Sequence, residues 1–351
     1  MTAGSLNGPA VRQFACFPHP ALKGEYVLKN NTFLHGDGLP AVCIKILAGI
    51  SIALIIFIFI FIFYQAWPVL RASGLDLLTT HNFDTQISEA FYSSDQSPVL
   101  NFGLLGLILG TLITTTLALV IAVAIGIGAS IAICEFAPPV LASALKAIIR
   151  LLASIPSVVF GLIGVIAVVP YIQETFVTVD MQMEYLSMFQ ITGKSLMASA
   201  VVLTFMIVPT VISLSVDAIS AVPQTYRETG FAFGMTHFRV IWKILLPTAR
   251  SGIISSVILA AGRGIGEAIA VSMVCGGVGI LPDFSHGFVS FLAPVLPLSA
   301  AIVNKSEAMS SVAVRSTLFA CAAILLVMGA FLSIGARLVE RRMRRAVGFE
   351  K

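Results

Sequence analysis

The chain has 351 residues, of which 58% are apolar and only 11% are charged. A soluble globular domain carries about 25% charged residues, so this composition excludes an ordinary water-soluble enzyme and indicates an integral membrane protein. The formal net charge of +4 is modest, so the placement of the charges along the chain is more informative than their total.

The cysteines and histidines do not form a metal-binding pattern. The five cysteines contain no CxxC pair, and the five histidines contain no HExxH pair. An odd number of cysteines, lying mostly in or beside apolar runs, also argues against a disulfide framework. We therefore expect no metal site and no disulfide.

The amino-terminal segment 1–45 is mixed in composition and carries Arg12, Lys23, Lys29 and Lys45. The first long apolar run begins only after Lys45 and covers Ile46–Phe63 without a charge. A signal peptide would have a shorter apolar run nearer the start. We expect residues 1–45 to be a cytoplasmic arm and the run to be a retained first membrane span.

Further charge-free stretches predict the other spans. They are Phe102–Cys134, Leu151–Gln173, Ser195–Val216, a run between Arg250 and Asp283 that only Arg263 and Glu267 interrupt, and Ser316–Ala336. Each approaches or exceeds the roughly 20 residues that a membrane-crossing helix needs. The sequence predicts an all-α integral membrane protein in which residues 46–340 form a domain of about six transmembrane helices.

One more apolar segment, Phe284–Val303, is interrupted by Pro294 and Pro297. We expect it to be an external loop, with a re-entrant segment as the alternative. Pro156 is expected to kink the third span, with Ser154 and Ser157 available to bond the freed backbone groups.

The basic residues predict the orientation. Sixteen Lys and Arg fall in the amino-terminal segment, in the loops after the second and fourth spans, and in the tail, whereas four fall in the alternate loops. The positive-inside rule then places both termini in the cytoplasm. The basic tail 341–351 is read as an anchor beside anionic lipid, in preference to a nucleic-acid site, because it directly follows a span.

The cytoplasmic loop 217–250 contains two short predicted helices. Pro223 suits a first helical position, and Gly234 can adopt the positive φ that ends a helix. Thr236 suits the N-cap of the second helix, and Pro247 is expected to stop it. An elbow of this size, within residues 222–247, suits docking into another protein.

The spacing of Glu228, Gly234, Ile244 and Pro247 in this loop resembles the EAA loop of ABC importer permeases. The chain departs from that pattern at Thr229 and Gly230, where the family has two alanines, and Gly230 is expected to cost about 1 kcal/mol of helix propensity. The resemblance implies that these four residues couple the membrane helices to a separate ATPase subunit.

Three further stretches resemble phosphate importer permeases of the PstC kind. They are the third-span run Leu151–Leu162, the start of the second span at Phe102–Thr111, and the fifth-span run Gly262–Val271. The resemblance covers about residues 45–345. It implies a type I ABC importer permease in a bacterial inner membrane, an ATPase dimer, a second, PstA-like permease and an extracytoplasmic phosphate-binding protein.

The chain itself is not expected to be an enzyme or to bind a cofactor. Gly193-Lys194-Ser195 is similar to the end of a Walker A motif, but Met188 stands where the first glycine is required. The resemblance implies that the partner subunit binds the ATP.

Arg263 and Glu267 are the charges expected inside a span. A central arginine costs about 2.5–3.5 kcal/mol on insertion scales. At i and i+4 the two residues would share one helix face. An arginine fork matches an oxyanion. A carboxylate could accept a hydrogen bond from the P–O–H group of hydrogen phosphate, a donor that sulfate lacks, while repelling fully ionised sulfate. Substrate contact and a purely structural ion pair both remain open. Gly262 and Gly266 form a GxxxG pair, for which close helix packing is the favoured interpretation.

Two other functions are compatible with the sequence. A permease for sulfate, molybdate or another oxyanion would share the coupling loop. An ion-coupled secondary transporter would explain the spans and the charged pair, but it would leave the EAA-like loop without a purpose.

Overall fold

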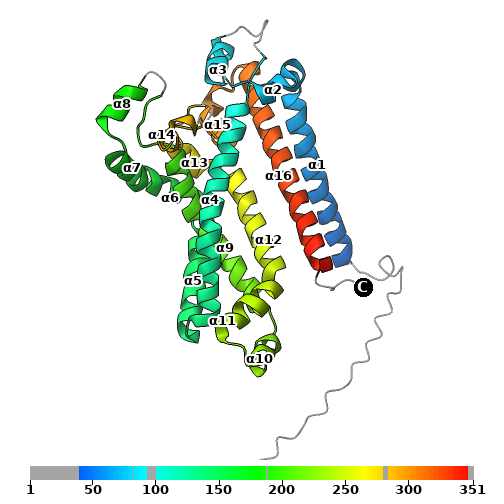
Figure 1. Cartoon of the computed structure of the whole chain (residues 1–351). Coiled ribbons are helices and arrows are strands. Elements are labelled where there is room, and N and C mark those ends of the chain that lie inside the picture. The colour runs from blue at the N-terminus through cyan, green and yellow to red at the C-terminus, as the bar shows by residue number, and fades with distance from the viewer. Residues whose placement is uncertain (1–38, 82, 93–99, 187–188, 280–283, 347–351) are drawn as a thin grey trace, which may run out of the picture. The chain divides into compact units, whose positions relative to one another are not determined.

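The computed structural model describes residues 39–81, 83–92, 100–186, 189–279 and 284–346 (Figure 1). The chain divides into two units, Met1–Ile55 and Ile56–Lys351. Helix α1 (Leu39–Ser73) begins in the first unit and ends in the second. The expected arm 1–45 therefore lies mostly outside the described residues.

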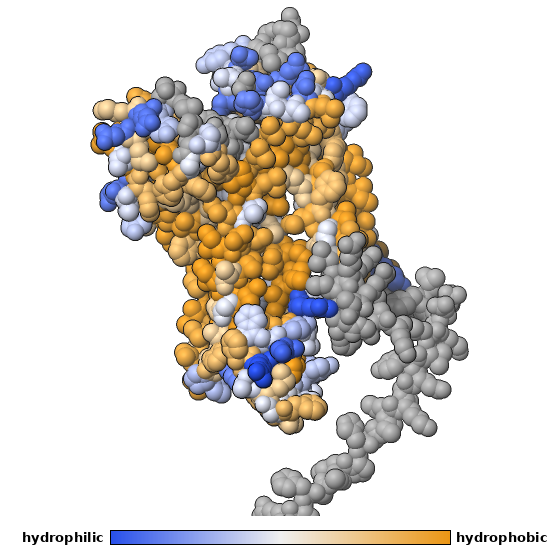
Figure 2. All heavy atoms as spheres, in the orientation of Figure 1, coloured by the Kyte–Doolittle hydropathy of each residue, from blue (hydrophilic) through white to orange (hydrophobic). Residues whose placement is uncertain are grey.

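Within the described residues, six helical segments are long and apolar enough to cross a membrane. They are Val42–Ser73, Leu105–Phe136, Ser157–Phe176, Leu196–Ser220, His237–Gly266 and Val312–Leu338. The prediction of six spans is confirmed. On the visible face of the second unit, apolar residues form the broad middle and hydrophilic residues gather at the two ends, as a bilayer-spanning body requires (Figure 2).

The spans are built from the longer helices and from π-helical turns that continue them. The elements are α4 (Leu105–Ile131) with η1 (Ala132–Phe136), α6 (Ser157–Ile163) with η2 (Gly164–Val168) and α7 (Val169–Phe176), α9 (Leu196–Ser220), α11 (His237–Val240) with η3 (Ile241–Leu245) and α12 (Leu246–Gly266), and α16 (Val312–Ala346). A separate helix, α5 (Pro139–Ser154), precedes the third span. The expected tail boundary at 341 is not a helix end, because α16 continues to Ala346.

Shorter helices connect the spans. They are α2 (Asp76–Thr79), α3 (Phe83–Tyr92), α8 (Val179–Tyr185), α10 (Gln224–Ala232), α13 (Ile269–Val274), α14 (Val289–Leu292) and α15 (Leu298–Asn304), with the 3₁₀ turns η4 (Phe284–His286) and η5 (Ser306–Ala308). The pairing between Gly276 and Val295 is an isolated bridge, and the described residues contain no longer strand.

Helix α9 lies at the centre of the second unit and packs along α4 and α12. Small residues allow this close approach. A Cβ at Gly126 of α4 would lie 2.6 Å from Val211 Cγ1, and one at Gly252 of α12 would lie 2.5 Å from Ala218 Cβ. Helices in membranes associate through such small-residue contacts, because lipid gives no hydrophobic drive to bring them together.

The run 151–173, expected to be the third span, is broken at Pro156, and the span begins after the break, at Ser157. Ile155 and Pro156 are extended, with ψ of 132° and 139°, and they separate α5 from α6. Proline disfavours a helical conformation in the residue before it, so the expected kink is a full break. Ser154 Oγ donates to Leu151 O at 2.7 Å, as expected for a freed carbonyl. Lys146 and Arg150, expected in a loop, lie on the helix α5.

The fifth span begins earlier than expected. Pro247 does not stop a helix, because it lies in the first turn of α12 and the span runs from His237 to Gly266. The π-helical turn η3 provides the physical reason. Leu246 N–H bonds to Ile241 O, five residues back, and this wider turn accommodates a residue without a backbone N–H.

The segment expected to be an external loop is instead packed inside the protein. α15 contacts α4, α13 and α16, and Leu292, Leu296 and Leu298 are buried. Leu298 N–H donates to Thr111 Oγ1 of α4 at 2.9 Å. Irregular backbone of this kind is tolerated in a membrane protein where other protein surrounds it.

Candidate functional site

The coupling loop forms an elbow at the end of the second unit where α10 and α11 lie (Figure 1). α10 begins at Gln224, so Pro223 is at the N-cap and not at the first helical position. Gly234 has a φ of 72°, as expected. Gly234 N–H donates to Phe231 O and Met235 N–H donates to Gly230 O. This pair of bonds is a Schellman motif, which closes the carboxyl end of α10.

Thr236 stands at the N-cap of α11, but its side chain makes no capping hydrogen bond. Of the coupling residues inferred from the sequence, Glu228 and Pro247 are exposed and Ile244 is half-buried. These residues do not converge on one point. They lie along a small two-helix body, in which α10 packs on α11 and η3.

Gly230 has a packing role that the sequence did not indicate. It is buried, and a Cβ there would lie 2.8 Å from Ile244 Cδ1 and 2.9 Å from Val240 Cγ2. The glycine therefore lets α10 lie directly against η3. Its cost in helix propensity is accompanied by closer packing between the two arms of the elbow.

The outer surface of the elbow is rich in exposed aromatic side chains. They are Tyr226, Phe231, Phe233, Phe238 and Trp242. Phe238 and Trp242 lie one turn apart, with ring centroids 5.9 Å from each other. Exposed aromatic groups on a surface that also carries polar residues are typical of protein interaction sites.

A buried ion cluster, which sequence reasoning missed, connects this elbow to α4. Glu135 lies in η1, and its side chain is only 5% exposed. Arg227 of α10 donates from Nε and Nη2 to Glu135 Oε1 at 3.2 and 3.0 Å. His237 Nε2 lies 3.2 Å from Glu135 Oε2. Arg227 and His237 follow Glu135 in the chain by 92 and 102 positions, so no local pattern could have joined them to it.

Arg263 and Glu267 do not form the helical pair that their spacing suggested. α12 ends at Gly266, and Glu267 has a ψ of 114° outside the helix. Glycines at 262, 264 and 266 weaken the helix in this stretch. The shared-face prediction is therefore wrong, and within the described residues the two side chains have separate partners.

Arg263 connects α12 to α9. Its Nη1 donates to Thr210 Oγ1 at 2.8 Å. Among the described residues, Nε and Nη2 have no hydrogen-bond partner. This free edge of the guanidinium is the geometry that binds a tetrahedral oxyanion through two parallel hydrogen bonds.

Glu267 is buried and holds the start of α13. Its Oε1 accepts the N–H of Ala270 at 3.0 Å, and its backbone carbonyl accepts Ser299 Oγ at 2.7 Å. In the described part of the chain Oε2 has no hydrogen-bond partner. One carboxylate oxygen is thus structural, and the other can accept a further hydrogen bond.

Within the described residues, the GxxxG pair makes no close packing contact. A Cβ at Gly266 would meet nothing within 4 Å, and one at Gly262 would reach only Leu332 Cδ2 at 4.0 Å. Close packing belongs to Gly264, where a Cβ would lie 3.0 Å from Thr115 Cγ2. The face carrying Gly262 and Gly266 is open.

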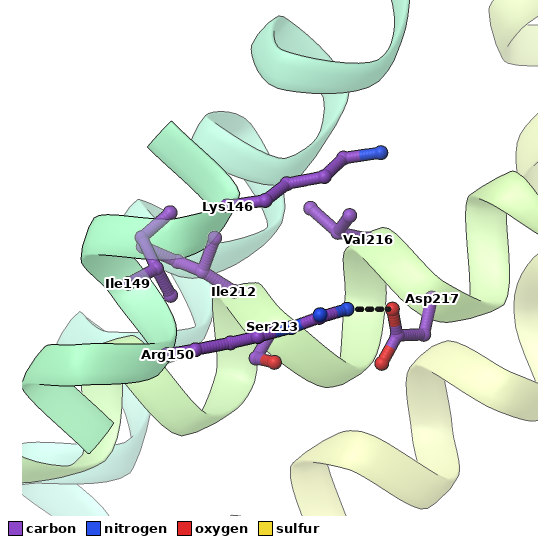
Figure 3. A pocket seen from close by; sticks show the side chains of 7 residues that line it. All are labelled: Lys146, Ile149, Arg150, Ile212, Ser213, Val216 and Asp217. Carbon is purple, nitrogen blue, oxygen red and sulfur yellow. Dashed lines mark ion pairs between the residues drawn. The ribbon is translucent and has the colours of Figure 1, made fainter. Parts of the chain in front are cut away.

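Arg150 of α5 points to Asp217 of α9, with Nη2 and Oδ1 3.6 Å apart (Figure 3). Both side chains are largely exposed, so the pair adds little stability.

A cavity of about 390 Å³ between α4, α5, α6 and α9 is lined almost entirely by apolar side chains. An anion would lose hydration there without compensation.

The described residues contain no group of three or more His, Cys, Asp or Glu that could hold a metal. Their four cysteines, Cys43, Cys134, Cys275 and Cys321, are free thiols. The side chains of Arg263 and Glu267 can recognise a ligand through charge and hydrogen bonds.

Comparison with known proteins gives consistent matches. The family model for "Binding-protein-dependent transport system inner membrane component" matches residues 124–345. The "Probable ABC transporter permease protein YqgH" of Bacillus subtilis is 30% identical over 311 residues, covering 89% of this chain and 92% of that protein. The "Phosphate transport system permease protein PstC 1" of Mycobacterium bovis is 32% identical over 256 residues, covering 70% and 74%.

The fold also resembles a solved structure. A bacterial alginate ABC transporter in complex with an alginate pentasaccharide-bound periplasmic protein contains a chain that aligns with a TM-score of 0.51 at 15% identity. The alignment covers 85% of this chain and 95% of that one. At this identity the similarity establishes the fold and carries no information on the solute.

Proposed function

Because the chain belongs to the binding-protein-dependent transport system inner membrane component family, we propose that it is the permease subunit of an ATP-driven importer of inorganic phosphate. The observation that supports phosphate as the solute is the 32% identity to a phosphate transport system permease over 256 residues. The chain spans the membrane and forms part of the path, while ATP is bound and hydrolysed by a separate subunit.

The elbow of α10 and α11 is the docking element for that ATPase. Its exposed aromatic side chains and the exposed Glu228 offer a mixed apolar and polar surface, as protein interfaces require. The Schellman turn at Gly234 and the close packing at Gly230 make the elbow a small rigid body. A rigid element can pass a displacement to the spans on either side, α9 and α12.

Arg263 is the proposed phosphate contact. Its Nε and Nη2 edge can donate two hydrogen bonds to one phosphate while Nη1 stays on Thr210. Glu267 Oε2 can accept a hydrogen bond from the P–O–H group of hydrogen phosphate and repels fully ionised sulfate. Discrimination of this kind is strong, because the wrong anion leaves a buried polar group without a partner.

The assembly needs further subunits. We infer a pair of ATPase subunits, a second, PstA-like permease and an extracytoplasmic phosphate-binding protein, in a bacterial inner membrane with both termini of this chain in the cytoplasm. The open Gly262 and Gly266 face supports a path or a partner helix on that side of α12, since nothing in the described chain covers Gly266.

The test is uptake of labelled phosphate by cells lacking this chain, with and without a plasmid that restores it. We expect restoration to depend on the plasmid and to resist excess sulfate. Competition by sulfate or molybdate would assign a different oxyanion. Uptake that persists without any ATPase subunit would assign an ion-coupled transporter.

A further inference from the structure

The contact between Glu135 and the elbow connects α4 to the elbow, although the two are not neighbours along the backbone. The backbone connects the elbow to α9 at one end and to α12 at the other. α4 precedes it by some ninety residues, since Glu135 and Arg227 are 92 positions apart. The ion cluster therefore attaches a third span to the elbow.

The geometry of the cluster favours a firm attachment. Arg227 donates two hydrogen bonds to one oxygen of Glu135, and His237 contacts the other oxygen. Arg227 Nη1 also donates to Val222 O at 3.2 Å, at the end of α9. A carboxylate that is 5% exposed is costly to leave unpaired, so separation of the elbow from α4 is strongly opposed.

Two aromatic rings pack against His237 of the cluster. Phe136 lies edge-on to the ring of His237, with centroids 5.4 Å apart, and Phe231 of α10 lies on it at 6.0 Å. Both rings are partly exposed to solvent, so it is the burial of the Glu135 carboxylate, 5% exposed, that strengthens its contacts. Both arms of the elbow, α10 through Arg227 and α11 through His237, thus meet on one side chain of α4.

α4 leads from this cluster to the proposed phosphate contact. The helical segment Leu105–Phe136 is continuous, including η1. Thr115, twenty residues before Glu135 and so about 30 Å away along a helix, packs against Gly264, the residue next to Arg263. A continuous helix transmits a displacement at one end to contacts near the other.

We propose that Glu135 is a positioning residue that makes α4 follow the movement of the ATPase-docking elbow, so that ATP hydrolysis is coupled to the transport path. This inference rests on the proposed function, because it assumes that an ATPase moves the elbow. Glu135 touches neither ATP nor the solute. It acts through Arg227 and His237.

The experiment uses the assembled transporter in proteoliposomes with Glu135→Gln, Arg227→Gln and the double variant. We expect each single variant to capture the ATPase and hydrolyse ATP, but to take up at least about fivefold less phosphate per ATP, the lower end of typical coupling effects. The double variant should be no worse than either single, because all three lose the same contact. Asp217→Asn, an exposed paired carboxylate on α9, should behave as the unaltered chain.

Several outcomes would overturn the proposal. These are unchanged uptake per ATP in Glu135→Gln, additive defects in the double variant, or loss of ATPase capture in the double variant. A single variant could fail to assemble because it leaves one charge buried without its partner. In that case the test is made on the double variant, which removes both charges of the Glu135–Arg227 contact.

A distance measurement separates this proposal from the identity of the solute. Spin labels at the exposed residues Gln224 of α10 and Asn101, just before α4, should give the same narrow distance with and without trapped nucleotide. Glu135→Gln should shift or broaden that distance, and identical distributions would reject the proposal. A transporter that passes this test without taking up phosphate would reject the proposed solute alone.

Discussion

Arg263 of α12 donates a hydrogen bond from Nη1 to Thr210 Oγ1 of α9 at 2.8 Å. This contact orients the guanidinium and leaves its Nε and Nη2 edge without a partner among the described residues. A bidentate oxyanion site needs that edge to be free. A neutral hydroxyl thus positions the arginine, and no acidic side chain among the described residues pairs with it.

Replacement of Arg263 tests this arrangement. Arg263→Gln should abolish phosphate uptake because the charge is lost. Arg263→Lys should lower the initial rate by about tenfold or more, because losing one hydrogen bond to a charged group costs about 1.5–3 kcal/mol. The measurement is initial uptake of labelled phosphate, normalised to membrane abundance.

The matched controls are Thr210→Ser, which keeps the hydroxyl and should transport, and the double variant Arg263→Gln with Glu267→Gln. Because the two charged side chains do not contact each other, the double variant should assemble and remain inactive. Recovery of uptake in the double variant would show that the two charges balance each other and that Arg263 does not bind the solute.

Glu267 has a structural oxygen and a free one, and two substitutions separate these roles. Glu267→Gln retains an acceptor for Ala270 N–H, so thermal stability should change little while phosphate uptake falls. Glu267→Ala leaves that buried donor unpaired and should also destabilise the protein by about 1–3 kcal/mol. Thermal unfolding and uptake, measured on both variants, check this. Equal stability of the two variants would contradict the capping role.

Gly230→Ala tests the packing of the elbow. The added Cβ would lie 2.9 Å from Val240 Cγ2, and overpacking of this kind costs about 1–3 kcal/mol. We expect weaker capture of the ATPase subunit, with recovery when Val240→Ala makes room. If Gly230→Ala captures the ATPase as well as the unaltered chain, the two arms of the elbow do not need this close contact.

Glycine is needed at position 234 for its backbone conformation and not because a side chain would lack space. Its φ is 72°, and a Cβ there would meet nothing within 4 Å. Gly234→Val should therefore weaken ATPase capture through a backbone cost of about 1–2 kcal/mol, and membrane insertion should be normal. Asparagine tolerates this conformation, so Gly234→Asn should retain most capture. Equal capture by both variants would remove the turn from the coupling mechanism.

Most of the fold could be predicted from the sequence, because a helix that crosses the bilayer must be apolar along its length. Charge-free runs such as Phe102–Cys134 and Ser195–Val216 therefore mark the spans directly. The confirmed spans Leu105–Phe136 and Leu196–Ser220 differ from those runs only at their ends. The turn at Gly234 was also predictable, since it depends on one residue's backbone freedom.

The remaining features depend on contacts between distant residues. Pro247 reads locally as a helix stop, and only the wider turn η3 lets the helix continue through it. Arg263 and Glu267 have the spacing of a helical pair, but α12 ends between them. Glu135 and Arg227 meet only because the tertiary fold places η1, which continues α4, beside α10. Local periodicity carries no information on any of these.

The most direct test of the central claim is ATP-driven solute uptake by proteoliposomes that contain this chain, its ATPase subunits and a second permease, supplied with the phosphate-binding protein. We predict accumulation of labelled phosphate that requires ATP on the side of the membrane where the ATPase subunits lie. Excess sulfate should not reduce this accumulation. Accumulation of sulfate or molybdate in place of phosphate, or uptake driven by an ion gradient without ATP, would contradict the account.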